Sequence, residues 1–206
     1  MDGGSPVAAA FGIGVALAAA PGPVQAVVLS ESVRGGVGRG LRAVAGVHVT
    51  FGALLAMLAL GLSVATPRGS VLRGLEVAGG LLLLWLAYDG IKTAPRAGPN
   101  PDEGRRVPPA VRGMLAILLN PGGWLFLGAV ASPLLATATW HDGTTGALLA
   151  AVALVAGAAT GDIAVVLLGG LGLRKAGARV DVSVRIALAG LLAGLGVWLL
   201  VSGLIP

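Results

Sequence analysis

Long apolar runs alternate with short polar segments along most of this chain. The runs predict six helices, at residues 6–30, 41–64, 71–91, 111–136, 146–173 and 184–204. Each run is long enough to cross the roughly 30 Å hydrocarbon core of a bilayer as a helix. Only helices and closed barrels satisfy their backbone groups in lipid, and the alternation of polar and apolar residues typical of barrel strands is absent from the sequence. We therefore expect an all-α, multi-pass integral membrane protein.

The composition supports this class. Of 206 residues, 56% are hydrophobic and 11% are charged, whereas a soluble domain has about 25% charged residues. The absence of cysteine excludes disulfides and thiolate metal sites. The apolar run near the start follows Met1-Asp2-Gly3-Gly4, which lacks the basic residues of a signal peptide, so we expect it to be retained as a span.

The basic residues lie mostly in alternate connections. Twelve of the 14 Lys and Arg residues fall between spans 1 and 2, 3 and 4, or 5 and 6. The positive-inside rule places these connections in the cytoplasm and both termini outside the cell. The expected location of the protein is the cell membrane. This distribution is typical of a membrane protein, so no nucleic-acid partner is expected. Trp140, in the outer connection "TWHDGTT", is expected to lie at the membrane interface.

Six spans divide into two halves of three that face opposite ways. The first half contains "AAAPGPVQ" and the second "LLNPGGWL", with Pro21 and Pro121 100 residues apart. Two weaker matches support the division. Gly46 and Gly61 of span 2 have the same spacing as Gly157 and Gly172 of span 5, and spans 3 and 6 share Ala-Gly, at 78–79 and 189–190. These matches predict two inverted three-helix repeats, 1–93 and 111–206, joined by a cytoplasmic loop, 94–110.

Proline interrupts spans 1 and 4 at corresponding places. Pro21 and Pro23 should free the carbonyls of Leu17 and Ala19, and Pro121 that of Ile117. Each break also starts a new helix with unpaired amides, which Asn120 is placed to cap in span 4. Paired breaks in two halves of a transporter point to its binding site. We therefore expect a small-molecule site formed by Pro21, Gly22, Pro23, Gln25, Asn120, Pro121 and Gly122. A packing kink is the alternative interpretation.

Two ionisable residues lie deep within predicted spans, His48 in span 2 and Asp162 in span 5. Buried ionisable groups in a bilayer are costly and usually mark ion or proton pathways. We expect Asp162 and His48 to couple transport to a proton or another ion. Three other acids lie near span ends, each with a basic residue three positions away, and are expected to form interface salt bridges: Glu31 with Arg34, Glu76 with Arg73, and Asp89 with Lys92.

Several of these segments resemble the LysE/RhtB family of amino-acid exporters. The resemblance covers nearly the whole chain, in order, and rests on "PGPVQAVVLSESVRGGVGRGLRAVAG", "AGGLLLLWLAYDGIK" and "LLNPGGWLFLGAV". It implies a small six-helix secondary exporter of amino acids or their derivatives, driven by the proton or ion gradient, and a homodimer. The chain departs from the family pattern at Val24, Gly122 and Thr50-Phe51, so the substrate of known members does not carry over.

Other functions fit the sequence less well. A cation or metal-ion transporter is the alternative within the same superfamily, but the chain has one deep acid, two histidines and no cysteine, and divalent ions usually need more ligands. A membrane scaffold would leave the matched breaks unexplained. No nucleophile and base set or cofactor motif is present, so we expect neither an enzyme nor a bound cofactor or metal.

Overall fold

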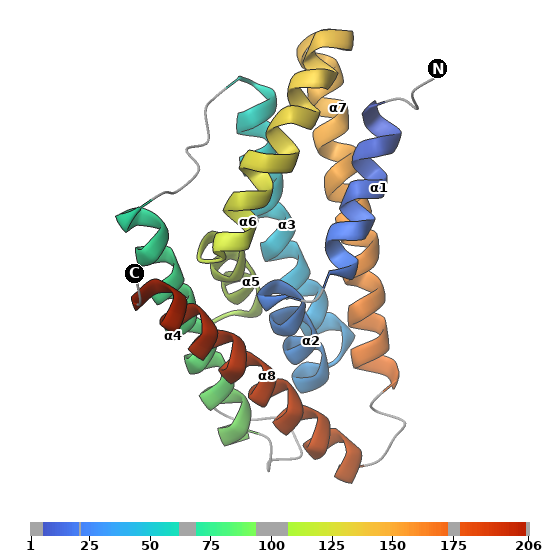
Figure 1. Cartoon of the computed structure of the whole chain (residues 1–206). Coiled ribbons are helices and arrows are strands. Elements are labelled where there is room, and N and C mark those ends of the chain that lie inside the picture. The colour runs from blue at the N-terminus through green and yellow to red at the C-terminus, as the bar shows by residue number, and fades with distance from the viewer. Residues whose placement is uncertain (1–5, 21, 62–68, 94–106, 173–177, 205–206) are drawn as a thin grey trace.

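The computed structural model describes residues 6–20, 22–61, 69–93, 107–172 and 178–204 (Figure 1). In these ranges the chain is helical and has no strand. The helices are α1 (Pro6–Ala19), α2 (Pro23–Gly35), α3 (Val37–Ala59), α4 (Ser70–Thr93), α5 (Pro109–Leu118), α6 (Pro121–Phe126), α7 (Ser132–Leu167) and α8 (Ala178–Leu204), with π-helical segments η2 (Leu127–Ala131) and η3 (Leu168–Gly172). The predicted all-α class is confirmed.

The described helices include four that are long and apolar enough to cross a membrane: Val37–Ala59, Ser70–Lys92, Pro121–Leu171 and Val182–Leu204. The pair α1 and α2 passes the same test as one span, bent by 67°, which raises the number to five. This number differs from the six predicted spans because Pro121–Leu171 is one helical run that contains parts of two. The protein is therefore a multi-pass membrane protein.

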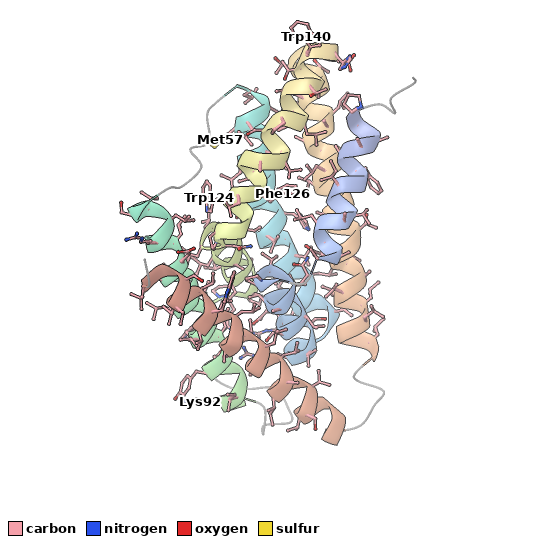
Figure 2. The ribbon with its side chains drawn as sticks, in the orientation of Figure 1. Met57, Lys92, Trp124, Phe126 and Trp140 are labelled. Carbon is pink, nitrogen blue, oxygen red and sulfur yellow. The ribbon has the colours of Figure 1, made fainter. Side chains whose placement is uncertain are left out.

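The long run Pro121–Leu171 turns back on itself within α7. At Asp142 the backbone leaves the helical region, and Gly143 has a φ of 65°, which is a left-handed conformation that favours glycine. Figure 1 shows the chain reversing direction there, at the top of the view. A straight 36-residue helix would extend about 54 Å, well beyond one bilayer core. Trp140, at this turn, is 88% exposed. Figure 2 places Trp140 and Lys92 at opposite ends of the molecule.

The connection between the first two predicted spans is shorter than expected. The sequence placed span ends at residues 30 and 41, but α2 continues to Gly35 and α3 begins at Val37. Gly36 alone separates them, with a φ of 75°, and its amide donates to the carbonyl of Ser32 at 2.7 Å. Arg34 and Arg39 are consequently helical residues that face other helices, and they do not lie in a loop.

Glycines allow the helices to cross closely. The main contacts join α1 with α7, α3 with α5, and α4 with α8. At each crossing, a Cβ built on a glycine of either helix would lie within 3.0 Å of a backbone atom of the partner: Gly14 and Gly157, Gly46 and Gly113, Gly80 and Gly196. Small residues at helix crossings are typical of membrane proteins, where close backbone approach supplies van der Waals contact.

Helix α2 lies at the centre of the packing. Its buried positions include Val24, Ala26, Val27 and Val28, and it contacts α3, α5, α7 and α8. The bend that separates it from α1 turns its first residues toward the middle of the molecule (Figure 1). Gln25 is thereby carried into the interior.

Candidate functional site

The end of α1 and the starts of α2 and α6 meet at a cavity of about 370 Å³. The middle parts of α3 and α7 close one side of it, and residues near the start of α4 and the end of α8 close another. Eight of the nine predicted site residues line this cavity: Gly22, Pro23, Gln25, His48, Asn120, Pro121, Gly122 and Asp162. The ninth, Pro21, lies outside the described residues.

Asp162 is the centre of the polar wall of the cavity. Its side chain is 4% exposed and belongs to α7. The side-chain amide Nε2 of Gln25, on α2, donates to Oδ1 of Asp162 at 2.8 Å and also contacts the carbonyl of Ala18 at 3.0 Å. Nε2 of His48, on α3, lies 3.0 Å from Oδ2 of Asp162. Three helices thus bring the deep acid, the deep histidine and the polar residue of the first break into one cluster.

The contact between His48 and Asp162 is close, but it is not a well-formed hydrogen bond. Neither ring nitrogen of His48 meets hydrogen-bond geometry with any described residue, and both atoms are buried. The distance is that of an ion pair when the imidazole is protonated. An unsatisfied buried imidazole is costly, so the ring of His48 offers hydrogen-bonding atoms to a molecule bound in the cavity.

Two of the three carbonyls that the prolines should free, those of Leu17 and Ile117, accept hydrogen bonds from the protein itself. The carbonyl of Leu17 accepts from the amide of Ala20 at 3.2 Å, and that of Ile117 accepts from the amide of Asn120 at 3.2 Å. Both are tight turns that end the preceding helix. A carbonyl oxygen has two lone pairs, so each retains one acceptor site.

Asn120 acts as a helix cap in the second break, as predicted. Its Oδ1 accepts from the amide of Gly122 at 3.1 Å, and its carbonyl accepts from the amide of Gly123 at 3.0 Å. The indole Nε1 of Trp124 then donates to the carbonyl of Leu118 at 2.8 Å. The polar groups of this break are therefore largely paired within the protein, whereas Gly22 at the start of α2 supplies no side-chain cap.

A second charged cluster, which we call the inner network, lies beyond the cavity. It comprises Glu31, Arg34, Arg39, Asp89 and Arg112, from α2, α3, α4 and α5. Figure 2 places Lys92, which is three residues from Asp89, at the end of the molecule opposite Trp140. The network therefore marks the end that carries the predicted cytoplasmic connections.

Arg112 joins the two acids of the inner network. Its side chain is fully buried, with Nη1 3.1 Å from Oε1 of Glu31 and Nη2 2.8 Å from Oδ2 of Asp89. Glu31 also pairs with Arg39 at 2.6 Å, and Asp89 with Arg34 at 2.8 Å. The predicted pair of Glu31 with Arg34 is present at 3.7 Å.

The sequence offered no signal for the role of Arg112. Local spacing pairs an acid with a base three positions away, but Glu31 and Arg112 are 81 residues apart. Lys92, the expected partner of Asp89, places its Nζ over the ring of Tyr88, 5.9 Å from the centroid. Glu76, for which a salt bridge with Arg73 was expected, lines the cavity.

An apolar layer separates the cavity from the inner network. Along α2, Gln25 lines the cavity, Val28 is fully buried, and Glu31 belongs to the network. Val28 packs in a cluster that includes Val44 of α3 and Ala116 of α5. In this conformation the cavity is therefore closed toward the network by apolar packing and by buried ion pairs.

The family model of the LysE type translocators matches residues 15–203 of this chain, which is most of its length. The family inferred from the sequence motifs is thereby confirmed. No curated protein and no solved structure matches the chain. Among the described residues, no group of three or more His, Asp or Glu side chains is arranged to hold a metal ion.

Proposed function

The chain belongs to the LysE type translocator family, and we propose that it is a secondary active exporter of an amino acid or a related small zwitterionic metabolite. Members of this family are membrane transporters rather than enzymes. The proposed location is the cell membrane, and the proposed driving force is the proton gradient. The observation that carries the proposal is the cluster of Gln25, His48 and Asp162 on the wall of a 370 Å³ cavity at the helix breaks.

The proposed architecture is six crossings in two inverted repeats, 1–93 and 111–206. An inverted repeat that relates span 1 to span 4 and span 2 to span 5 must also exchange their contacts. The contact of α1 with the second part of α7 would then have a counterpart in the contact of α5 with α3. Both contacts occur, through Gly14 with Gly157 and through Gly113 with Gly46, and the α4–α8 contact corresponds to itself.

The proposed orientation places both termini and Trp140 outside and the loop 94–110 in the cytoplasm. Twelve of 14 basic residues belong to the connections on the proposed inner side. Substrate would enter from the side of the inner network and leave toward the Trp140 end. Entry requires the apolar layer and the network to separate, which is one half of an alternating-access cycle.

The proposed coupling step is competition for Asp162. A substrate ammonium group pairs with the negative charge of this carboxylate, and a proton neutralises it. Either can therefore occupy the site, and each weakens the binding of the other. Substrate bound from the cytoplasm would be released outside when a proton binds the site. The site would then open inward with this proton on His48 or Asp162, and the proton would be released to the cytoplasm. One substrate leaves and one proton enters in each such cycle.

The test uses the full chain in proteoliposomes with a labelled mixture of amino acids and an imposed pH gradient. A gradient of one pH unit is worth about 1.4 kcal/mol per proton, so one-for-one antiport concentrates substrate up to about tenfold. We expect Asp162→Asn to retain exchange between equal pools and to lose this concentration. Asp142→Asn, at the exposed turn of α7, is the matched control and should behave like the parent. If Asp162→Asn concentrates substrate as well as the parent does, the coupling mechanism is wrong.

A further inference from the structure

The walls of the cavity differ in polarity. Gln25, His48 and Asp162 form a polar wall at the first break. The apolar residues that line the same space include Leu17, Val47, Phe51, Ile117, Phe126 and Leu199, which come from five helices. The rings of Phe51 and Phe126 pack at 6.1 Å between centroids. A bound molecule therefore meets one polar cluster at the first break and a lining that is otherwise largely apolar, with Glu76, Asn120 and Ser202 among its other polar side chains.

The ionisable part of the cavity lining consists of two carboxyl groups and one imidazole. Among the described lining residues the ionisable ones are Asp162, Glu76 and His48, with no lysine or arginine. A second carboxylate on a substrate would enter a low-dielectric space without a counter-charge, which is strongly unfavourable. An additional side-chain carboxylate is therefore disfavoured relative to a neutral side chain, while an ammonium group has Asp162 as its partner.

A charged or hydroxylated side chain is disfavoured against the apolar part of the lining. Glu76, from α4, is the other carboxyl group among the described lining residues and is the partner that a cationic side chain reaching it would find. The apolar side chains of Phe51 and Ile117 line the same space from α3 and α5. A charged or hydroxylated side chain placed against them would lose its water without gaining hydrogen bonds.

The size of the cavity limits the substrate further. A volume of 370 Å³ is the share of about a dozen water molecules in liquid water. That is enough for one amino acid with a side chain as large as that of phenylalanine.

We infer that the substrate is an amino acid with an uncharged, apolar side chain, of the size of leucine to phenylalanine. Its ammonium group lies against Asp162, and its side chain lies against the apolar wall that includes Val47 and Phe51. This inference rests on the proposed function and narrows it to a substrate class.

The test is exchange by the purified full chain in proteoliposomes, with leucine, phenylalanine, threonine, lysine and glutamate measured separately. Exchange between equal pools needs no net proton movement, so it is independent of the coupling mechanism. We expect leucine and phenylalanine to exchange at least about tenfold faster than the other three, since one misplaced polar group or missing methylene changes selectivity by about this factor or more. Exchange of lysine, threonine or glutamate at an equal or higher rate would overturn the substrate class and leave the proposed function standing. Exchange of none of the five would overturn both.

Two variants with the same substitution, one lining the cavity and one not, test whether the substrate side chain contacts the apolar wall. Val47→Thr adds a hydroxyl to a cavity-lining position with almost no change in shape. Val44→Thr makes the same change one turn earlier on α3, at a buried position that does not line the cavity. We expect the leucine-to-threonine exchange ratio to fall about threefold or more in Val47→Thr and to stay unchanged in Val44→Thr, since the ratio follows contact with the substrate. An unchanged ratio in Val47→Thr, or an equal fall in both variants, would refute the proposed contact.

Discussion

Arg112→Met tests whether the inner network holds the cytoplasmic side of the molecule closed. Arg112 is fully buried, pairs with Glu31 and Asp89, donates from Nε to the carbonyl of Val107 at 3.1 Å, and lies 4.9 Å from the ring centroid of Trp85. Methionine keeps an unbranched side chain and removes the charge and its donors. The variant therefore removes the connection between the two acids and leaves the helix intact.

The loss of stability in Arg112→Met depends on the ion pairs that remain in the inner network. Removing one partner of a buried ion pair usually costs about 3–5 kcal/mol, because the other charge is left without compensation. Here Glu31 keeps Arg39 at 2.6 Å and Asp89 keeps Arg34 at 2.8 Å. The network changes from three cations and two anions to two of each. We therefore expect the low end of the range, about 3 kcal/mol. For a chain of this size, that corresponds to a fall of about 6–12 °C in the melting temperature.

The assay is thermal unfolding of the detergent-solubilised protein, with Arg42→Met as control. Arg42 is an exposed arginine of α3, one turn beyond Arg39, and its replacement should leave the melting temperature unchanged. If Arg112→Met melts at the same temperature as Arg42→Met, the buried pairs do not stabilise this conformation.

A second measurement tests closure directly. The chain has no cysteine, so Val28→Cys introduces a single thiol into the apolar layer between cavity and network. In the parent background this thiol should react slowly with a water-soluble reagent. In the Arg112→Met background it should react several times faster, because the layer opens more often. Equal labelling in the two backgrounds would show that the network does not control access to the cavity.

Two further predictions follow from the packing and the charge distribution. Thr144→Cys, at the exposed turn of α7, should be labelled by an impermeant thiol reagent on intact cells, and Gly38→Cys, at the start of α3, should not; the reverse pattern would refute the proposed orientation. Gly14→Ala and Gly157→Ala should each lower stability by about 1–3 kcal/mol, because the added methyl overlaps backbone of the facing helix. Gly12→Ala has open space and should melt like the parent, so equal effects at all three positions in thermal unfolding would contradict the crossing geometry.

The sequence alone determined the properties that depend on neighbouring residues along the chain. Runs of apolar residues indicated helices in a membrane, and proline marked the region in which α1 ends and α2 begins. The segment "TWHDGTT" contains the reversal of α7, because glycine adopts the left-handed conformation found at Gly143. Asn120 was identified as a cap from its position before Pro121. These are local effects of backbone sterics and of solvent, so no knowledge of packing was needed.

Only the tertiary structure decided which polar groups meet. Asp162 and His48 could be singled out as deep ionisable residues, but not as neighbours, and Gln25 bonds to an acid 137 residues away. The inner network escaped prediction for the same reason, since the charge at Arg112 resembles an ordinary interface arginine when only its nearest neighbours are considered. Membrane helices are apolar on nearly every face, so their pattern does not say which face points inward. That choice is made by close glycine crossings and by the pairing of buried charges, which are properties of helices brought together from distant parts of the chain.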